Sequence, residues 1–274
     1  MKIRRLYPGG RPKALTLSYD DGIEQDRRFV EILNRHGLKC TFNLNSELLV
    51  RRDRWYCREV EVVRMDPETL PALYRGHEAA LHMATHPHPT ELSDADLRRE
   101  TADDMAFHTR LFGYPVCGMA YPFGEYDERV IGLLEEMGVA YARTVHSTHD
   151  FSLPGRWLEW HPTVHHTERE AEPLFEAFMQ TDSELALFYL WGHSYEFDVD
   201  QEWERIESLC ARMADQPDIF YATNMEIYTY ISALRRLEVA DLKLHNPTEQ
   251  TLWVEADGEV IRLGAGETCR LREG

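Results

Sequence analysis

The stretch Leu17-Ser18-Tyr19-Asp20-Asp21-Gly22 ends an apolar, strand-like run with two adjacent carboxylates and a glycine. Neighbouring side chains on a strand point to opposite faces, but a strand that gives way to a loop at Gly22 can turn both carboxylates toward one cleft. There one carboxylate can bind a cation while the other accepts a proton. The stretch therefore predicts a hydrolytic metal site at the end of a strand.

Two histidines offer the remaining ligands. The segment His82-Met83-Ala84-Thr85-His86 places them four residues apart. On one turn of a helix this spacing puts both imidazoles on the same face, where they can hold a single ion. We therefore predict that Asp21, His82 and His86 are metal ligands and that they leave one coordination position open for water.

The composition limits the possible functions. The chain has 274 residues, enough for one large domain or a barrel with a small appendage, and a formal charge of -18. This charge argues against nucleic acid and anionic membranes as partners, because both would be repelled. The five cysteines lack a CxxC pair, which favours reduced thiols over disulfides or a thiolate zinc site. Pro8-Gly9-Gly10 interrupts the basic N-terminus, so we see no signal peptide or membrane span and expect a cytoplasmic location.

Apolar strand-like runs alternate with helical patterns, which is typical of βα units and a parallel sheet or barrel. Ser93, with Asp96 three residues later, predicts the start of a helix that continues to residue 112. From residue 241 onward, short alternating runs separated by turn residues predict a small antiparallel β module. We expect a barrel over residues 1–238 and the module over residues 239–274. The predicted parallel strands are residues 14–19, 40–44, 116–121, 139–143, 185–191 and 219–222.

Three motifs follow three different predicted strands. They are Asp20-Asp21, Tyr121-Pro122-Phe123-Gly124 and Trp191-Gly192-His193. In barrels of parallel strands the active site lies at the carboxyl ends of the strands. These motifs are therefore expected to meet at one mouth.

In this order the motifs resemble those of the polysaccharide deacetylase family, also known as the NodB-homology domain or carbohydrate esterase family four. Asp20-Asp21-Gly22 is similar to the first family motif, and the segment from His82 to Pro87 is similar to the second. Ala120-Tyr121-Pro122-Phe123-Gly124 occupies the place of the third, and Leu190-Trp191-Gly192-His193 that of the fifth. The resemblance covers roughly the first 235 residues. It implies an α/β fold, a distorted (β/α) barrel of about seven parallel strands.

The resemblance also implies an activity. Asp21, His82 and His86 would bind a divalent metal, with zinc as the first choice and cobalt or nickel as alternatives. Asp20 would act as general base and His193 as general acid. The protein would be a metal-dependent hydrolase of carbon–nitrogen, non-peptide bonds. Its partner would be a small molecule or an oligosaccharide, and the implied reaction is deacetylation of an N-acetylated sugar.

Other residues are assigned around this centre. The expected substrate contacts are Tyr121, Pro122, Phe123 and Trp191, and the residues expected to support the site from behind are Trp160, His165 and His166. Ala120 stands where the extracellular family members usually carry an arginine. The cation that orients the base must then come from elsewhere, and Arg143 is the candidate.

Three alternatives stay open on the sequence alone. The same scaffold could hydrolyse a cyclic amide or another carbon–nitrogen bond. A degenerate deacetylase would bind carbohydrate without cleaving it. Two histidines and a carboxylate also hold iron(II) in non-haem oxygenases. In this chain the aspartate precedes a close histidine pair, and that order of ligands argues against an oxygenase site.

Overall fold

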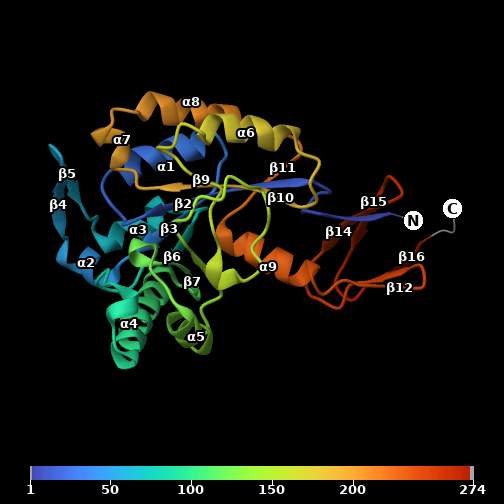
Figure 1. Cartoon of the computed structure of the whole chain (residues 1–274), viewed down its shortest axis with the longest axis horizontal. Helices are drawn as coiled ribbons and strands as arrows, with labels where there is room; N and C mark the ends of the chain where they lie inside the picture. Colours follow the sequence, from blue (N-terminus) through green and yellow to red (C-terminus); the bar gives the residue numbers. More distant parts are fainter. Residues whose placement is uncertain (1, 272–274) are drawn as a thin grey trace.

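The computed structural model describes residues 2–271, in which strands and helices alternate over most of the length (Figure 1). The strands are β1 (Ile3–Leu6), β2 (Lys13–Asp20), β3 (Cys40–Leu44), β4 (Arg54–Cys57), β5 (Val60–Val63), β6 (Glu78–Leu81), β7 (Gly118–Ala120), β8 (Tyr141–Arg143), β9 (Val164–His165), β10 (Ala186–Gly192), β11 (Ile219–Tyr221), β12 (Glu238–Ala240), β13 (Lys243–His245), β14 (Leu252–Ala256), β15 (Glu259–Leu263) and β16 (Thr268–Arg270). The helices are α1 (Asp26–Arg35), α2 (Ser46–Arg51), α3 (Leu70–Leu73), α4 (Asp94–Phe112), α5 (Glu128–Glu136), α6 (Ala171–Gln180), α7 (Glu196–Val199), α8 (Trp203–Met213) and α9 (Asn224–Leu234). Short 3-10 turns lie at Pro67–Thr69, Pro89–Glu91, Pro122–Gly124 and Trp157–Glu159.

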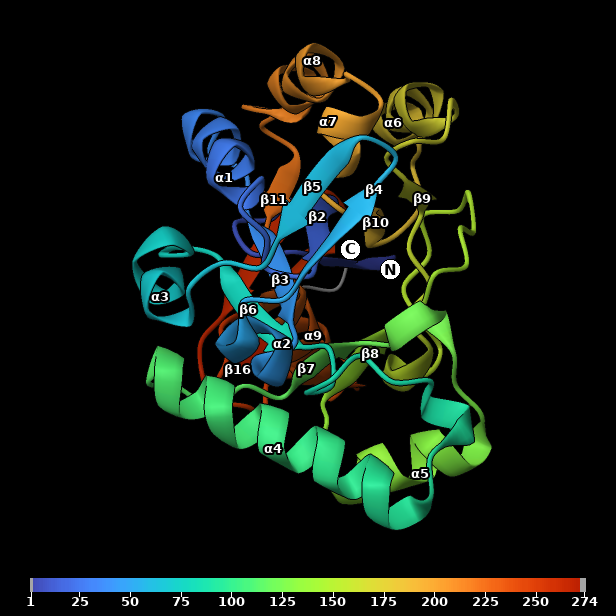
Figure 2. The same ribbon diagram turned by 90° about the vertical axis from the view of Figure 1, so that its left-hand side faces the viewer.

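The centre of the fold is a curled parallel sheet. Within residues 2–271, seven strands form a continuous path in the order β8-β7-β6-β3-β2-β10-β9. Strand β11 pairs with the first half of β2, next to the place where β3 pairs with the second half. Helices surround the strands when the molecule is viewed from the end (Figure 2). The predicted distorted barrel of about seven parallel strands is confirmed.

Strand β2 is the middle of this sheet, and all eight of its residues are buried. Strands covered on both faces need a nearly continuous apolar run, which explains why Ala14, Leu15 and Leu17 follow one another so closely. On one side α1 packs Phe29 and Leu33 into the same core cluster as β2 and β3. The covered sheet therefore fixes the position at which β2 ends in Asp20.

The predicted strands lie within two residues of observed ones, but β6 and β9 were not predicted. Strand β9 has only two residues, too few to show a strand pattern, and the four residues of β6 begin with the charged Glu78, which interrupts the apolar run. The helix predicted after Ser93 is α4, and the Ser93 hydroxyl accepts the Asp96 N–H as its cap. None of the helices described between residues 2 and 271 is both long and apolar enough to cross a membrane.

The tail of the chain is antiparallel, as predicted. It contributes the three-stranded sheet β12-β13-β16 and most of a second sheet, β1-β14-β15. The first strand of the chain thus joins the last part of the sequence, with Leu6 opposite Trp253 (Figure 1). Leu252 and Val254 of this module share a buried cluster with Ile227 of α9. The domain boundary at residue 238 stays a prediction.

The carboxyl ends of the parallel strands lie at the left-hand end of the molecule in Figure 1. Helix α2 follows β3 there, α7 follows β10, and the antiparallel hairpin of β4 and β5 projects at the same end. In Figure 2 this hairpin crosses in front of the strands. It forms one wall of the site described next.

Candidate metal centre and active site

The two adjacent carboxylates face the same cavity, as the sequence predicted. Asp20 is the last residue of β2, and Asp21 follows it with φ 88°. A positive φ is uncommon for a residue other than glycine, and here it interrupts the strand alternation that would separate the two side chains. The Asp21 N–H is held by the carbonyl of Asn43 at 2.9 Å. Both Asp20 and Asp21 line the cavity as a result.

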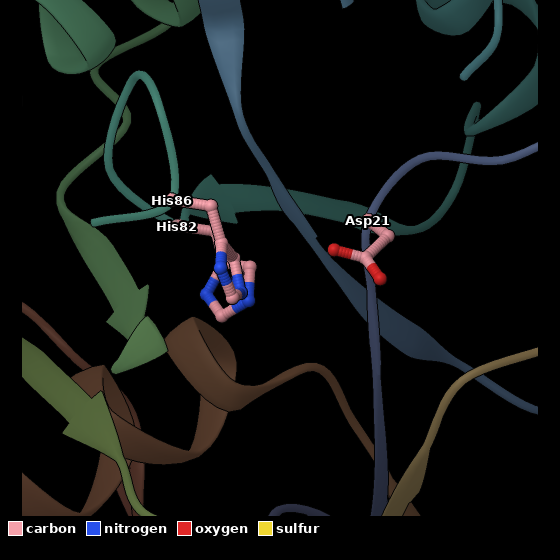
Figure 3. Close-up of side chains that lie close together, drawn as sticks. All are labelled: Asp21, His82 and His86. Atoms are coloured by element: carbon pink, nitrogen blue, oxygen red, sulfur yellow. The ribbon is translucent and has the colours of Figure 1, made fainter. Parts of the chain in front are cut away.

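His82 and His86 also meet Asp21, but they do not lie on a helix. The prediction of one helical turn was wrong, because Met83 and His86 adopt positive φ values of 57° and 54° and the segment is a loop after β6. The loop still brings the imidazole centroids within 4.7 Å of each other. The ligand atoms of Asp21, His82 and His86 all lie within 4.8 Å of one another (Figure 3).

The protonation states of the three side chains suit a cation. Burial lowers the pKa of His82, and it lowers the pKa of His86 to about 3, so both imidazoles are neutral and offer lone pairs. The Nδ1–H of His82 donates to the Ala120 carbonyl at 2.8 Å, which leaves its Nε2 free. One carboxylate and two neutral imidazoles form a donor set that zinc accepts, so these residues fit a divalent metal.

Asp21 is held ionised mainly by Arg64. Burial works against ionisation, but the Arg64 guanidinium, 3.0 Å from Asp21 Oδ1, acts together with other nearby groups to hold the pKa of Asp21 well below its usual range. Arg64 also donates to the main-chain oxygen of Asp21 and, at 2.6 Å, to Asn45. The carboxylate is therefore fixed in place from one side. Arg64 follows β5 without any motif around it, so this role could not be predicted from local sequence.

Asp20 lies beside these ligands and has its own partners. Its Oδ1 accepts from Asn43 at 2.8 Å, and its Oδ2 accepts from Arg143 at 2.5 Å. Burial opposes ionisation of Asp20, yet the nearby cationic groups, Arg143 first among them, together outweigh it and lower the pKa of Asp20. The same Oδ2 lies 3.9 Å from His82 Nε2. Arg143 thus supplies the cation that the third motif lacks at Ala120.

His193 follows β10 and closes the other side of Asp20. Its Nε2 lies 3.7 Å from Asp20 Oδ2, and its Nδ1 lies 3.3 Å from Glu196 Oε2. Burial alone would lower the pKa of His193, but the hydrogen bond to Glu196 and the charge of Asp20 raise it to about 9. Glu196 was not among the predicted site residues. Its position three residues after His193, where it also accepts the His193 N–H at 2.9 Å, follows the spacing of a capping box.

The cavity above the metal ligands has a volume of about 600 Å³. Of the expected substrate contacts, Tyr121, Phe123 and Trp191 line it, while Pro122 is absent from its wall. Two aromatic side chains that were not assigned to the site, Trp55 of the hairpin and Tyr195, complete the wall. The sequence offered no way to place Trp55, because the hairpin reaches the site only through the fold.

Trp160, His165 and His166 lie outside the cavity wall. Trp160 is 1% exposed, and its backbone pairs with that of Arg143 in an isolated parallel β-bridge. It therefore lies in the core next to the end of β8. His165 and His166 lie behind His193, where both imidazoles approach Glu196. The structure therefore places all three next to residues of the site rather than in the cavity.

Part of the chain matches a known protein family. Residues 8–142 match the family model described as polysaccharide deacetylase. No curated protein matches the sequence of this chain.

Solved structures share the fold at low identity. A putative polysaccharide deacetylase from Mycobacterium smegmatis is 16% identical, with a TM-score of 0.61 over 87% of this chain and 98% of that one. A peptidoglycan N-acetylglucosamine deacetylase is 14% identical, with a TM-score of 0.53 over 80% of this chain and 94% of that one. The deacetylase PplD of Streptococcus pyogenes, solved with acetate, is 16% identical with a TM-score of 0.46, and the match covers 53% of this chain but only 61% of PplD. The family match identifies residues 8–142 as a polysaccharide deacetylase domain, and the curled parallel sheet has the fold of the solved deacetylase structures.

Proposed function

We propose that this protein is a metal-dependent hydrolase that removes the acetyl group from the nitrogen of an N-acetylated sugar or oligosaccharide. The observation that carries the proposal is the convergence of Asp21, His82 and His86 within 4.8 Å. Asp20 and His193 lie directly beside them, with their facing atoms 3.7 Å apart. A cation site between a candidate base and a candidate acid is the arrangement that amide hydrolysis needs.

Asp21, His82 and His86 would hold the cation, with zinc as the first choice and cobalt or nickel as alternatives. When bound, such a cation lowers the pKa of a coordinated water and polarises an amide carbonyl. Arg64 would keep the Asp21 carboxylate ionised and oriented.

Asp20 is the candidate base. It is ionised through its pair with Arg143, and it is buried with only 2% exposure, so bulk water does not compete for its oxygen. Its Oδ2 faces the ligand His82, which places it next to the position of an attacking water. Asp20 would take a proton from that water as the carbonyl carbon is attacked.

His193 is the candidate acid. The bond from its Nδ1 to Glu196 leaves Nε2 facing Asp20 and the cavity. With a pKa raised to about 9, the ring carries a proton at neutral pH. That proton would pass to the amine nitrogen as the carbon–nitrogen bond breaks, which prevents the departure of an unstable amide anion.

The cavity wall supports a sugar as substrate. Trp55 and Tyr195 meet edge to face at 5.9 Å on one side, and Phe123, 52% exposed, stands on the other. Flat aromatic faces of this kind offer apolar contact to the carbon–hydrogen face of a sugar ring, while the carboxylates and histidines offer polar contact to its substituents.

The test is acetate release from a panel of N-acetylated sugars by chelator-treated protein, before and after zinc, cobalt or nickel is restored. We expect release only with metal, and none from an Asp21→Ala variant that folds normally by circular dichroism. Release that persists without metal would contradict the proposal. Bound metal with hydrolysis of cyclic amides but not of acetylated sugars would replace this substrate class, and sugar binding without any turnover would indicate a non-catalytic homologue.

A further inference from the structure

A second group of potential ligands lies behind His193. His165 stands at the end of β9, His166 follows it, and Glu196 begins α7. One ligand atom from each of the three side chains lies within 4.8 Å of the others. The proposed reaction uses neither imidazole.

The distances in this group match those of a tetrahedral site. His165 Nε2 lies 3.3 Å from Glu196 Oε2, and His166 Nε2 lies 3.4 Å from the same oxygen. In a tetrahedron with metal–ligand bonds of roughly 2.0 to 2.1 Å, neighbouring ligand atoms are about 3.3 to 3.4 Å apart. Glu196 thus already stands at the separation from each imidazole that a bound cation requires, and the two imidazoles offer ligand atoms within 4.8 Å of each other.

The opposite nitrogen of each ring is held by a hydrogen-bond partner. His165 Nδ1 contacts Thr167 Oγ1 at 2.8 Å, and His166 Nδ1 contacts the Tyr19 hydroxyl at 3.1 Å. The Thr167 N–H also approaches His165 Nδ1 at 3.3 Å, so a cation at Nε2 requires Nδ1 to carry the ring proton and donate it to Thr167 Oγ1. Histidines that bind metals in proteins are oriented through the second ring nitrogen. Both Nε2 atoms are therefore directed at Glu196.

His166 gives an independent sign of a missing partner. Its residue is 3% exposed, and its Nε2 is buried without a hydrogen-bond partner. Such buried polar atoms are rare and usually meet a water or an ion. Gly192 makes room for this ring, since a Cβ there would lie 2.0 Å from His166 Nδ1. The side chains of His165 and Glu196 are 14% and 21% exposed, so a cation can reach the group from solvent.

We propose that His165, His166 and Glu196 form a second divalent-cation site, distinct from the Asp21-His82-His86 centre. Two imidazoles and one carboxylate favour zinc or a similar borderline cation over magnesium or calcium, which prefer oxygen ligands. Water would complete the coordination. The site joins the end of β9 to the start of α7, the segment through which Glu196 also holds His193.

The experiment is zinc binding to chelator-treated protein, measured by titration calorimetry and by metal content after dialysis. The Asp21→Ala, His82→Ala double variant removes the first centre and isolates the second site. We expect about two equivalents of zinc in the wild type and about one in the double variant, with a melting temperature that rises as zinc is added.

A third change then tests the ligands. In the double-variant background His165→Gln should abolish the remaining equivalent and the zinc-dependent rise in melting temperature. The matched control is His245→Gln in the C-terminal module, which should leave the bound zinc and the rise in melting temperature unchanged. His245 is hydrogen-bonded to Thr268 and is distant in sequence from both proposed metal sites. His165 is chosen over the buried His166 to protect folding.

If the folded double variant binds no zinc, the proposal is overturned. It is also overturned if His165→Gln and His245→Gln lose the same amount of bound zinc. These outcomes are independent of deacetylation. Failure of the proposed function would appear instead as wild-type protein that releases no acetate with its first centre filled.

Discussion

Arg143 Nη2 donates to Asp20 Oδ2 over 2.5 Å, and the two side chains are 0% and 3% exposed. Arg143 lies on β8, at the edge of the seven-strand path, while Asp20 ends β2, four strands away. The guanidinium reaches across with its carbon 4.3 Å from the ring centroid of Trp191. A cation from a different strand thus replaces the one that Ala120 cannot provide.

Replacement of Arg143 by Met should slow acetate release by about 10²-fold or more, because Asp20 would lose both its orientation and the charge that keeps it ionised. Zinc content should stay the same, since Arg143 contacts none of Asp21, His82 and His86. Arg143→Lys is the matched control and should recover part of kcat, as it keeps the charge without the planar fork. Equal activity of wild type and Arg143→Met would show that Asp20 needs no such partner.

The two adjacent carboxylates, Asp20 and Asp21, should have different roles. Asp20→Asn is expected to retain bound zinc while acetate release falls by about 10²-fold or more, because an amide cannot accept the water's proton. Asp21→Asn, the same change one residue later, should weaken zinc binding, because a charged ligand is lost. Metal content and turnover measured on both variants decide the assignment. Loss of zinc in Asp20→Asn with its retention in Asp21→Asn would reverse the two roles.

The hairpin of β4 and β5 should contribute to substrate binding through Trp55. Trp55→Ala is expected to raise KM several-fold with little change in kcat, because Trp55 lines the cavity wall but is neither a metal ligand nor the candidate base or acid. Tyr56→Ala is the control from the same strand. Tyr56 is 69% exposed and is not part of the cavity wall, so its removal should leave KM unchanged. Similar effects of both changes would exclude a specific role for Trp55.

Asp26 should make stability depend on pH. It is buried and accepts hydrogen bonds from Ser194 and Tyr74, and burial raises its pKa from 3.8 to about 7 despite these bonds. Below pH 3.8 the folded and unfolded chains both carry this proton. As the pH rises toward 7, only the unfolded chain releases it, so the free energy of unfolding should fall across this window.

The measurement is urea unfolding of wild type and Asp26→Asn at pH 4.5 and pH 7.5. The difference between the two proteins isolates Asp26 from the other titrating groups. Between these two pH values the difference should shift in favour of Asp26→Asn by about 3 kcal/mol, because the unfolded chain has already released most of this proton at pH 4.5. A difference that is constant with pH would mean that the Asp26 carboxyl has an ordinary pKa in the folded protein.

Part of the site could be predicted from local sequence, because its residues follow strands whose pattern is visible. Asp20 is the last residue of the long buried strand β2 and Asp21 follows it, while His193 comes directly after the long buried strand β10. The conformation of the His82–His86 loop was missed, since a spacing of four suits a helix as well as a loop in which Met83 and His86 take positive φ. Short strands such as β9 were missed for lack of pattern.

The sequence by itself determined the parallel α/β fold and the set of motif residues that would meet, because apolar periodicity and strand ends are local properties of the chain. Only the tertiary structure decided which partners act on those residues. Arg143 reaches Asp20 across 123 positions, and Arg64 reaches Asp21 across 43. Contacts between such distant residues depend on how strands are ordered in the sheet and how loops cross its end, and no local spacing encodes either.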